Sequence, residues 1–464
     1  MSNRYASYSG YKPSETDWLG DIPQRWETIR SGFLYRREKR VGFVEEELLS
    51  VDRDHGVVPK SSRDDNFNKP SDDLSPYQLV ERGDLVLNKM KTWQGSIAVS
   101  EHQGIVSPAY FVYSPEAYVS DRCHSKYLHY LLRSPLYISQ YLRSSKGIRV
   151  NQWDLDPDLF KQIEVLLPHI FEQRAIASFL DRETGKIDRM IGKQERMIEL
   201  LKEKRQAVIS HAVTKGLDPN APMKDSGIEW LGEIPEHWDV RAISKSTTKI
   251  TNGYVGPTRG ILVESGVPYV QATHIKRGVV NFDGAYFVNK EWSYAHSKSI
   301  LKNGDVLIVQ TGAGTGDVGL VSENEVGYNC HALIILTPNK KVITGDYLAS
   351  TLQSHYGYSK LYSIRTGGMH PHLNCGEVQF VKTPIPPVRE QQEIIQYVEK
   401  QTARFDRLTE KAKQAIGLMK ERRTALISAA VTGKIDVREA VTYEAEKPLL
   451  MAAEEPALYG SENL

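Results

Sequence analysis

The chain has 464 residues, 25% of them charged and 40% hydrophobic, and its formal net charge at pH 7 is +1. This length exceeds what one hydrophobic core usually supports, so we expect a soluble globular protein of about two to four domains. A protein that binds nucleic acid without a partner subunit usually carries a larger positive charge than this. Three options stay open: no nucleic-acid binding, binding through local patches, or partners that add phosphate contacts.

The sequence disfavours the membrane, secreted and zinc-stabilised classes of protein. No apolar run approaches the roughly 18–20 residues that a bilayer span needs. The first residues, MSNRYASYSGYK, lack the apolar core of a secretion signal. The three cysteines (Cys123, Cys330 and Cys375) are widely spaced, which argues against a disulfide framework and a structural zinc site. We therefore expect a cytoplasmic protein.

A ten-residue motif occurs twice, about half a chain apart. DWLGDIPQRW (residues 17–26) and EWLGEIPEHW (residues 229–238) share Trp, Leu, Gly, Ile, Pro and Trp at matching positions. We call these segments the opening motifs. Their separation is far longer than the roughly 20–50 residues of a solenoid repeat, so it indicates a duplicated domain. We interpret their tryptophans as packing anchors rather than as ligand contacts.

A longer repeat closes each half of the chain. Residues 168–217 align without gaps to residues 386–435, and both carry apolar residues at a helical period. Gly216 and Gly433 are plausible stops. Each segment predicts a helix of about forty residues, roughly 60 Å long, a length typical of coiled coils. Gly185 and Gly192 weaken the first helix, by up to about 1 kcal/mol each, so we expect it to pack against the second.

The segments between these repeats are less alike and are predicted to be rich in β-strands. Runs such as DLVLNKM, AYFVYS, DVLIVQT and ALIILTP are short, apolar or alternating, and Gly, Asp and Pro separate them. Helices are expected within residues 126–144 and 345–361. Two landmarks recur: Gly83-Asp84 resembles Gly304-Asp305, and residues 104–115 resemble residues 327–338.

Several apparent catalytic or ligand motifs have a simpler interpretation. GTGDVG (residues 314–319) fits a dinucleotide fingerprint, but the next residues predict a strand rather than the required helix, which favours a turn or loop. No phosphate-binding loop or amino-methyltransferase motif occurs. His370, His372 and Cys375 fit no zinc pattern. Asp156 and Asp158 favour a turn over an acid pair, because Asn374 and Gly376 align with them.

The order of these motifs resembles the specificity subunit of a type I restriction-modification enzyme. PPVREQQEI (residues 386–394) opens the second long helix, and PHIFEQRAI (residues 168–176) is its weaker first copy. The opening motifs resemble the domain starts of that family. VPYVQATHIKRGVVNFDGAYFV (residues 267–288) resembles the strand-turn signature that opens a target recognition domain. The resemblance covers residues 15–436, and His169 and Phe171 depart from its helix-start pattern.

The resemblance implies an α+β fold with an internal pseudo-two-fold repeat. Two β-rich target recognition domains would be separated by two long helices that form an antiparallel coiled coil. The expected domains are residues 1–167 and 218–385 for recognition, each with an opening motif. Residues 168–217 and 386–436 would form the helices, and residues 437–464 a mobile tail.

The resemblance also implies a DNA-specificity subunit without a catalytic site. Its two recognition domains would bind a bipartite double-stranded DNA target, two methyltransferase subunits would dock along the helices, and restriction/translocase subunits would join them. No cofactor is expected on this chain, whereas S-adenosylmethionine and ATP with Mg²⁺ are expected on the partners, and no membrane is involved. Two identical partners need two equivalent docking surfaces, while two different half-sites allow the recognition regions to diverge.

Candidate DNA contacts are polar side chains in loops between apolar runs, because such side chains bind base edges and phosphates. The predicted contacts are Lys89, Lys91, Lys146, Arg149, Asn151 and Gln152 in the first half, and Lys276, Arg277, Arg365, His370, His372 and Asn374 in the second. The alternative for each is a solvated surface loop. Trp153 could stack on DNA, but core packing is favoured.

Repeated polar positions on the helices are the candidate partner-interface or architectural residues. They are Glu172, Gln173, Asp188, Arg189, Glu390, Gln391, Asp406 and Arg407. The alternative is exposed helix charge, which contributes little to stability. Three other functions stay open for the chain: a coiled-coil scaffold whose β-rich domains bind protein, a self-sufficient nuclease or methyltransferase, and a subunit of a methylation-only system.

Overall fold

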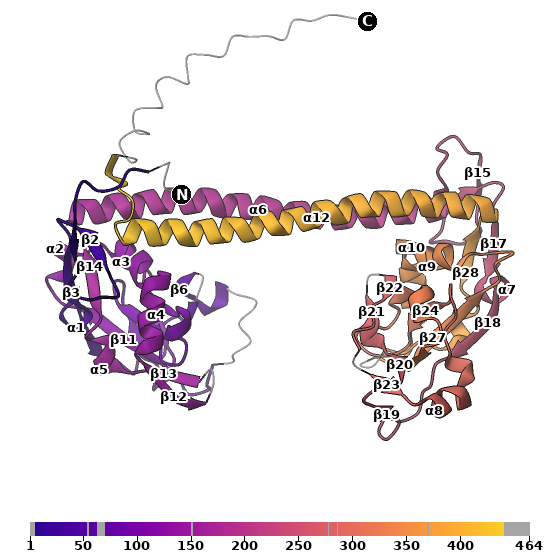
Figure 1. Ribbon diagram of the computed structural model, residues 1–464, viewed down its shortest axis with the longest axis horizontal. Helices are drawn as coiled ribbons and strands as arrows, with labels where there is room; N and C mark the ends of the chain where they lie inside the picture. The colour runs from indigo at the N-terminus through magenta and orange to yellow at the C-terminus, as the bar shows by residue number, and fades with distance from the viewer. Residues whose placement is uncertain are drawn as a thin grey trace, which may run out of the picture. The chain divides into compact units, whose positions relative to one another are not determined.

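The computed structural model describes residues 5–52, 55–62, 70–149, 152–276, 278–284, 286–368 and 371–439 (Figure 1). The side chains at positions 148, 149 and 152 are outside this description. The chain divides into two compact units: the first is Met1–Lys193 with Gln414–Leu464, and the second is Gln194–Lys413. None of the helices in the described ranges combines the length and hydropathy that a membrane span requires.

Two long helices contribute to both units. Helix α6 (Ile170–Lys215) has 46 residues and α12 (Val388–Val431) has 44. In the first unit the start of α6 packs on the end of α12, and in the second unit the start of α12 packs on the end of α6, so they run antiparallel (Figure 1). Gly216 and Gly433 follow the helix ends with φ of 76° and 70°. Both long helices and their predicted stops are confirmed.

The first unit is built on a four-stranded antiparallel sheet of order β4-β11-β8-β9. Its strands are β4 (Tyr35–Glu38), β11 (Tyr110–Pro115), β8 (Leu85–Asn88) and β9 (Ile97–Val99). Two consecutive helices, α3 (Ser125–Leu132) and α4 (Pro135–Arg143), share one buried core with this sheet and with α6 and α12. They confirm the helices expected in this stretch, with a break at Ser134.

Short elements complete the first unit. The paired strands are β1 (Tyr11–Pro13) with β2 (Asp21–Pro23), β3 (Glu27–Arg30) with β14 (Glu164–Leu167), β5 (Leu49–Asp52) with β6 (Gly56–Pro59), β7 (Gln78–Val80) with β10 (Gly104–Val106), and β12 (Ser145–Arg149) with β13 (Gln152–Leu155). The short helices are α1 (Ser31–Leu34), α2 (Val119–Arg122), α5 (Pro157–Phe160), η1 (Lys60–Ser62) and η2 (Thr92–Gln94).

The second unit has a six-stranded sheet of order β18-β27-β24-β25-β22-β21 and a four-stranded sheet of order β19-β23-β20-β26. The first comprises β18 (Thr247–Asn252), β27 (Leu333–Pro338), β24 (Val306–Val309), β25 (Val318–Leu320), β22 (Gly278–Val280) and β21 (Ile275–Lys276). The second comprises β19 (Leu262–Val263), β23 (Phe287–Val288), β20 (Val267–Val270) and β26 (Asn329–Cys330). Helices α9 (Gly345–Gln353) and α10 (His355–Ser363) confirm the second expected helical stretch.

The remaining elements of the second unit are also short. The strand pairs are β15 (Met223–Asp225) with β16 (Glu233–Pro235), and β17 (Asp239–Ala242) with β28 (Lys382–Ile385). The helices are α7 (Ile243–Ser246), α8 (Lys290–Ala295), α11 (Cys375–Val378), η3 (Ala272–His274), η4 (Ser297–Ser299) and η5 (Glu323–Glu325). Residues 314–317 of GTGDVG lie in the loop from β24 to β25, which confirms the predicted loop, but Val318 and Gly319 already belong to β25. The strand expected after the segment is wrong, because β25 ends at Leu320 and η5 follows.

The structure describes only the first residues of the predicted tail, up to residue 439. Val437, the first residue assigned to it, is fully buried in the core of the first unit, beside the end of α12. The backbone amide of Asp436 donates a 2.7 Å hydrogen bond to the carbonyl of Ala6. Ordered packing therefore reaches at least Val437, and residues 440–464 lie outside the described residues.

Candidate nucleic-acid interface

Each opening motif is fixed to the start of a long helix by one tryptophan. The indole Nε1 of Trp26 donates a 3.0 Å hydrogen bond to Glu172 Oε1, and Trp238 Nε1 donates a 3.0 Å bond to Glu390 Oε1. Both indoles are fully buried. The packing role predicted for these two tryptophans is confirmed.

The same motifs also contact the end of the other long helix. A Cβ added at Gly433 would lie 2.3 Å from Pro23 Cγ, and one added at Gly216 would lie 3.3 Å from Trp238 Cζ2. Only glycine fits such close contacts at positive φ without strain. Each opening motif therefore joins the start of one long helix to the end of the other, within one unit.

Gln173 and Gln391 make matching buried bonds next to these glutamates. The Gln173 amide accepts from the backbone N–H of His124 and donates to the carbonyls of Arg122 and Pro168, each at 2.8 Å. Gln391 accepts from Thr344 N–H at 2.9 Å and donates at 2.8 Å to the carbonyls of Val342 and Pro386. Both side chains are fully buried, which favours architecture among the two roles predicted for them.

The repeated aspartates form ion pairs between the two long helices. Asp188 Oδ1 lies 2.9 Å from Arg423 Nε in the first unit, and Asp406 Oδ1 lies 3.5 Å from Arg205 Nε in the second. Neither arginine was among the predicted site residues, although the gap-free alignment of residues 168–217 with 386–435 superposes Arg205 on Arg423. Arg189 and Arg407 are exposed, which leaves them available to a partner.

In the first unit, the loop from β8 to β9 carries two predicted DNA contacts, Lys89 and Lys91. Lys89 Nζ donates a 2.5 Å hydrogen bond to the carbonyl of Pro108 and lies 4.9 Å from the Phe111 ring centroid. The Arg37 guanidinium lies 4.1 Å from the same centroid. Burial, followed by the charge of Arg37, lowers the pKa of Lys89. Lys91 is exposed.

The β12–β13 hairpin docks on this loop. The backbone N–H of Leu155 donates a 3.0 Å hydrogen bond to the carbonyl of Lys89. The Trp153 ring packs edge-on against Trp93 with centroids 4.9 Å apart and is half-buried, so it contacts a neighbouring ring at the edge of the unit rather than in its buried core. Lys146 Nζ, largely exposed, pairs with Asp156 Oδ2 at 3.0 Å. The structure therefore gathers Lys89, Lys91 and Lys146 around one pair of loops.

The hairpin also positions the backbone of two further candidates. Arg149 and Gln152 are opposite each other at the end of the β12–β13 ladder. Their side chains are outside the description, and Asn151 lies outside the described residues altogether, as do Arg277 and His370 of the second half.

In the second unit, the loop from β24 to β25 packs on the segment after α10. Leu373 N–H donates a 2.9 Å hydrogen bond to the carbonyl of Gln310, and Thr315 Oγ1 donates a 3.1 Å bond to the carbonyl of Pro371. The backbone of His372 pairs in both directions with Thr366, at 2.8 and 2.9 Å. The glycine-rich loop and the predicted contact His372 therefore belong to one surface.

The Arg365 side chain of that surface packs against two aromatic rings. Its guanidinium lies 4.6 Å from the Tyr362 ring centroid and 5.7 Å from that of Tyr358. Burial raises the pKa of Asp317, and the charge of Arg365 opposes this shift. Arg365 Nε is buried and has no hydrogen-bond partner among the described residues. Two aromatic rings therefore orient the Arg365 guanidinium, and its Nε–H makes no hydrogen bond among the described residues.

Asn374 has a structural role in the same segment. Its Oδ1 accepts a 3.0 Å hydrogen bond from Glu377 N–H and caps α11. Asp156, which aligns with it, caps α5 by accepting from the N–H groups of Asp158 and Leu159. The interpretation of Asp156 and Asp158 as a turn is consistent with this cap. The side-chain oxygen of Asn374 therefore already accepts a hydrogen bond within the chain.

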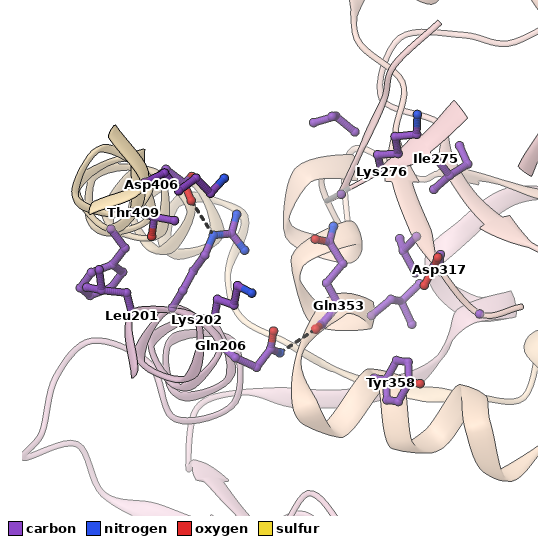
Figure 2. A pocket seen from close by; sticks show the side chains of 18 residues that line it. Leu201, Lys202, Gln206, Ile275, Lys276, Asp317, Gln353, Tyr358, Asp406 and Thr409 are labelled. Atoms are coloured by element: carbon purple, nitrogen blue, oxygen red, sulfur yellow. Dashed lines mark hydrogen bonds and ion pairs between the residues drawn. The ribbon is translucent and has the colours of Figure 1, made fainter. Parts of the chain in front are cut away.

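A groove of about 900 Å³ separates the helix pair from the β-rich region of the second unit (Figure 2). Figure 2 shows Lys202 and Gln206 on one wall and Lys276 and Asp317 on the other, and Gln206 Nε2 donates a 2.8 Å bond across to the carbonyl of Gln353. The predicted contact Lys276 is exposed here, at the edge of the six-stranded sheet. It shares this wall with Asp317, which belongs to the loop from β24 to β25 that also packs on the segment carrying His372.

The surface around Lys89 in the first unit includes cationic and apolar side chains that were not among the predicted contacts. Arg37 and Lys39 are exposed beside Lys89, and the pKa of Lys89 responds to both charges. Met90, between the two predicted lysines, is 43% exposed. Two stretches of the sequence indicate this surface. YRREKR (residues 35–40) is a basic run, and KMKTW (residues 89–93) mixes lysine with aromatic and apolar side chains.

Comparisons with known proteins agree over most of the chain. A family model described as "Type I restriction modification DNA specificity domain" matches residues 235–418. The specificity subunit of the type I restriction enzyme MjaVIII from Methanocaldococcus jannaschii is 23% identical over 90% of this chain and 94% of its own length. The EcoKI specificity subunit of Escherichia coli is 21% identical over 94% of both chains.

Two solved structures share the fold. A chain from a study of complex assembly and conformational transition of the type I restriction-modification system matches with a TM-score of 0.67 and 15% identity, over 88% of this chain and 98% of that one. The HsdS subunit of Thermoanaerobacter tengcongensis matches with a TM-score of 0.50 and 16% identity, over 89% and 98%. The predicted α+β fold, with two β-rich regions and an antiparallel pair of long helices, is confirmed.

Proposed function

We propose, from the premise that this chain belongs to the DNA specificity subunits of type I restriction-modification systems, that its two β-rich regions bind the two halves of a bipartite DNA target. The chain is the non-catalytic subunit that supplies DNA specificity in such a system. Such a chain has to recognise two different half-sites and bind two copies of one partner.

One observation supports two half-sites most directly. The bonds that tie each β-rich region to the long helices are repeated with the same residue types, Trp26 with Glu172 and Trp238 with Glu390. The exposed loops that these regions carry have different side chains. A repeated scaffold with unlike loops fits two recognition modules of different specificity, since loops on a rigid scaffold commonly carry binding residues.

We further propose that two methyltransferase subunits dock on the repeated helix surfaces, with restriction/translocase subunits joining them. The exposed Arg189 and Arg407, and the half-buried Glu172 and Glu390, stand at matching positions for such partners. S-adenosylmethionine and ATP with Mg²⁺ would be bound by those partners, in the cytoplasm. A net charge of only +1 fits this division, because partners can add phosphate contacts.

The proposed DNA contacts are Lys89, Lys91 and Lys146 in the first unit and Lys276, Arg365 and His372 in the second. Phosphate contacts by lysine and arginine hold a protein in register, whereas bidentate contacts to base edges carry sequence information. Arg365 is suited to the second task, because the rings of Tyr358 and Tyr362 orient its guanidinium.

The long helices would fix the spacing of the half-sites. A helix of 46 residues is about 70 Å long, which exceeds one turn of DNA at about 34–36 Å. We therefore propose a target with a constant unspecified gap between its two specified halves. Shortening both helices by matched pairs of turns should shorten this gap, and an unchanged gap would contradict the proposal.

The test is a map of modified adenines in a plasmid library. Cells would express this chain with its cognate methyltransferase subunit. The expected result is one bipartite motif with a constant gap, and replacing residues 28–166 should change one half-site while the other half-site and the gap persist. A stable complex that modifies no such motif would favour a protein-binding scaffold instead.

A further inference from the structure

Two loops occupy the same place in the two units, although their sequences differ. The turn before each loop is the repeated Gly-Asp landmark: Gly83 N–H donates to Ser100 O at 2.8 Å, and Gly304 N–H donates to Val321 O at 2.9 Å. The reciprocal bonds, from Ser100 N–H to Asp84 O and from Val321 N–H to Asp305 O, measure 2.8 and 2.9 Å. Both hairpins therefore start in the same register.

This register continues to the loops themselves. Asn88 N–H donates to Ser96 O at 2.9 Å in the first unit, and Val309 N–H donates to Asp317 O at 2.8 Å in the second. The enclosed loops, residues 89–95 and 310–316, have equal length. Each closes on a glycine with positive φ, 96° at Gly95 and 91° at Gly316. We call them the first and second connector loops.

Each connector loop is also held by the same external bond. Leu155 N–H donates to Lys89 O at 3.0 Å, and Leu373 N–H donates to Gln310 O at 2.9 Å. Lys89 and Gln310 are the first residues of their loops, and Leu155 and Leu373 each precede the cap of a short helix. The bonds that the two loops share are all between backbone atoms, so the exposed side chains of the loops can differ without moving the scaffold. Trp93 in the first loop and Thr315 in the second add side-chain contacts of their own.

The side chains in the two loops differ in size and charge. The first loop presents Met90, 43% exposed, and the exposed Lys91, while Trp93 anchors the loop on Trp153. The second presents Thr311, Gly312 and Ala313, all exposed, and a Cβ added at Gly312 would meet nothing within 4 Å. One loop projects long side chains, and the other leaves its backbone open.

We propose that the connector loops are equivalent base-recognition elements, and that their unlike side chains make the two half-sites different. This inference rests on the proposed function. In the first unit, Lys91 can donate to guanine O6 or N7, and Met90 can contact a thymine methyl group. In the second unit, the short side chains allow the DNA to approach the loop backbone, and Arg365 from the adjacent segment supplies the long donor.

The test uses the full chain in complex with its methyltransferase subunit, with modified adenines mapped as above. The first variant is Met90→Ala with Lys91→Ala, which removes exposed side chains only. The matched control is Lys161→Ala, which removes another exposed lysine of the first unit, one that pairs with Asp158 at 3.1 Å. We expect about a 10-fold loss of base preference within the first half-site, with the second half-site and the gap unchanged.

The second variant, Ala313→Glu, places a carboxylate at the exposed tip of the second loop. We expect at least about a 10-fold loss of modification, because a like charge would face the phosphates, while Ala117→Glu at an exposed position of the first unit leaves modification unchanged. Recovery of the intact complex by gel filtration confirms folding for every variant.

The outcomes separate the inference from the function on which it rests. If the wild-type complex modifies a bipartite motif but both loop variants behave like their controls, the inference is overturned and the proposed function stands. Equal loss at both half-sites in the Met90→Ala, Lys91→Ala variant would also overturn it, since the loop would then supply general affinity only. If the wild-type complex modifies no bipartite motif, the proposed function itself fails.

Discussion

The two units use the same bonds to hold their β-rich regions to the long helices, yet they present different loops on that support. Trp26 donates to Glu172 and Trp238 to Glu390 at the same 3.0 Å distance. By contrast, the first connector loop presents Met90 and Lys91 where the second presents Thr311 and Gly312. The difference shows that buried side chains hold each β-rich region to the long helices, whereas equivalent backbone bonds place two loops whose exposed side chains differ.

Removing the anchoring tryptophans should have the largest effect. Trp26→Ala and Trp238→Ala should each lower the free energy of unfolding of their own unit by about 3–5 kcal/mol, because each leaves a large cavity and removes a buried hydrogen bond to a glutamate. Glu172 would keep its bond from Tyr8, and Glu390 its pair with His237. Hydrogen exchange at α3 and α9 would measure the two units separately. Trp230→Ala is the control, since that indole is 51% exposed. Strongly unequal losses from the two anchors would contradict their equivalence.

Alanine substitution of the glycines that follow the long helices should destabilise the two units by different amounts. Gly433→Ala should destabilise the first unit by about 2–4 kcal/mol, because the positive φ is strained for alanine and the new Cβ would lie 2.3 Å from Pro23 Cγ. Gly216→Ala meets Trp238 only at 3.3 Å and should cost about 1–2 kcal/mol. Urea unfolding of both variants would rank them, and the reverse order would refute this packing argument.

A histidine in α3 should make the first unit more sensitive to acid than the second. Burial, followed by the charge of Arg133, lowers the pKa of His129 to about 3. This folded value is below the unfolded value of about 6.5, so the unfolded state binds the proton first. Stability should therefore fall as the pH drops from about 6.5 toward 3, by up to about 1.4 kcal/mol per pH unit.

The variant His129→Gln would isolate that contribution. Glutamine keeps an acceptor for Arg133, whose Nη1 lies 2.6 Å from His129 Nε2, but it does not titrate. Protection of α3 amides should then change less between pH 7 and pH 5 than in the wild type. Protection of α9, where the buried Ala349 stands one turn after the helix start, serves as the internal reference. An unchanged pH dependence in α3 would exclude His129 as its source.

The sequence was sufficient to predict the long helices, because periodicity and a terminal glycine are local signals. It could not predict that Trp26 bonds Glu172, since that contact joins residues far apart in the chain and depends on how the helix starts. Asn374 shows a role that the sequence did not reveal. It was predicted as a DNA contact because it is polar and lies in a glycine-flanked loop, and its side-chain oxygen also caps a helix of only four residues, which is too short to detect by periodicity.

The smallest expected effect concerns the ion pairs between the long helices. Asp188→Asn and Asp406→Asn should each cost less than about 1 kcal/mol, because all four side chains are 31–62% exposed and water screens them. The first should cost more, since Asp188 approaches Arg423 to 2.9 Å and Asp406 approaches Arg205 only to 3.5 Å. High salt should remove both losses, as it screens exposed charges. A loss that persists in high salt would instead assign these aspartates a packing role, and a loss of methyltransferase binding without any change in stability would assign them to the partner surface.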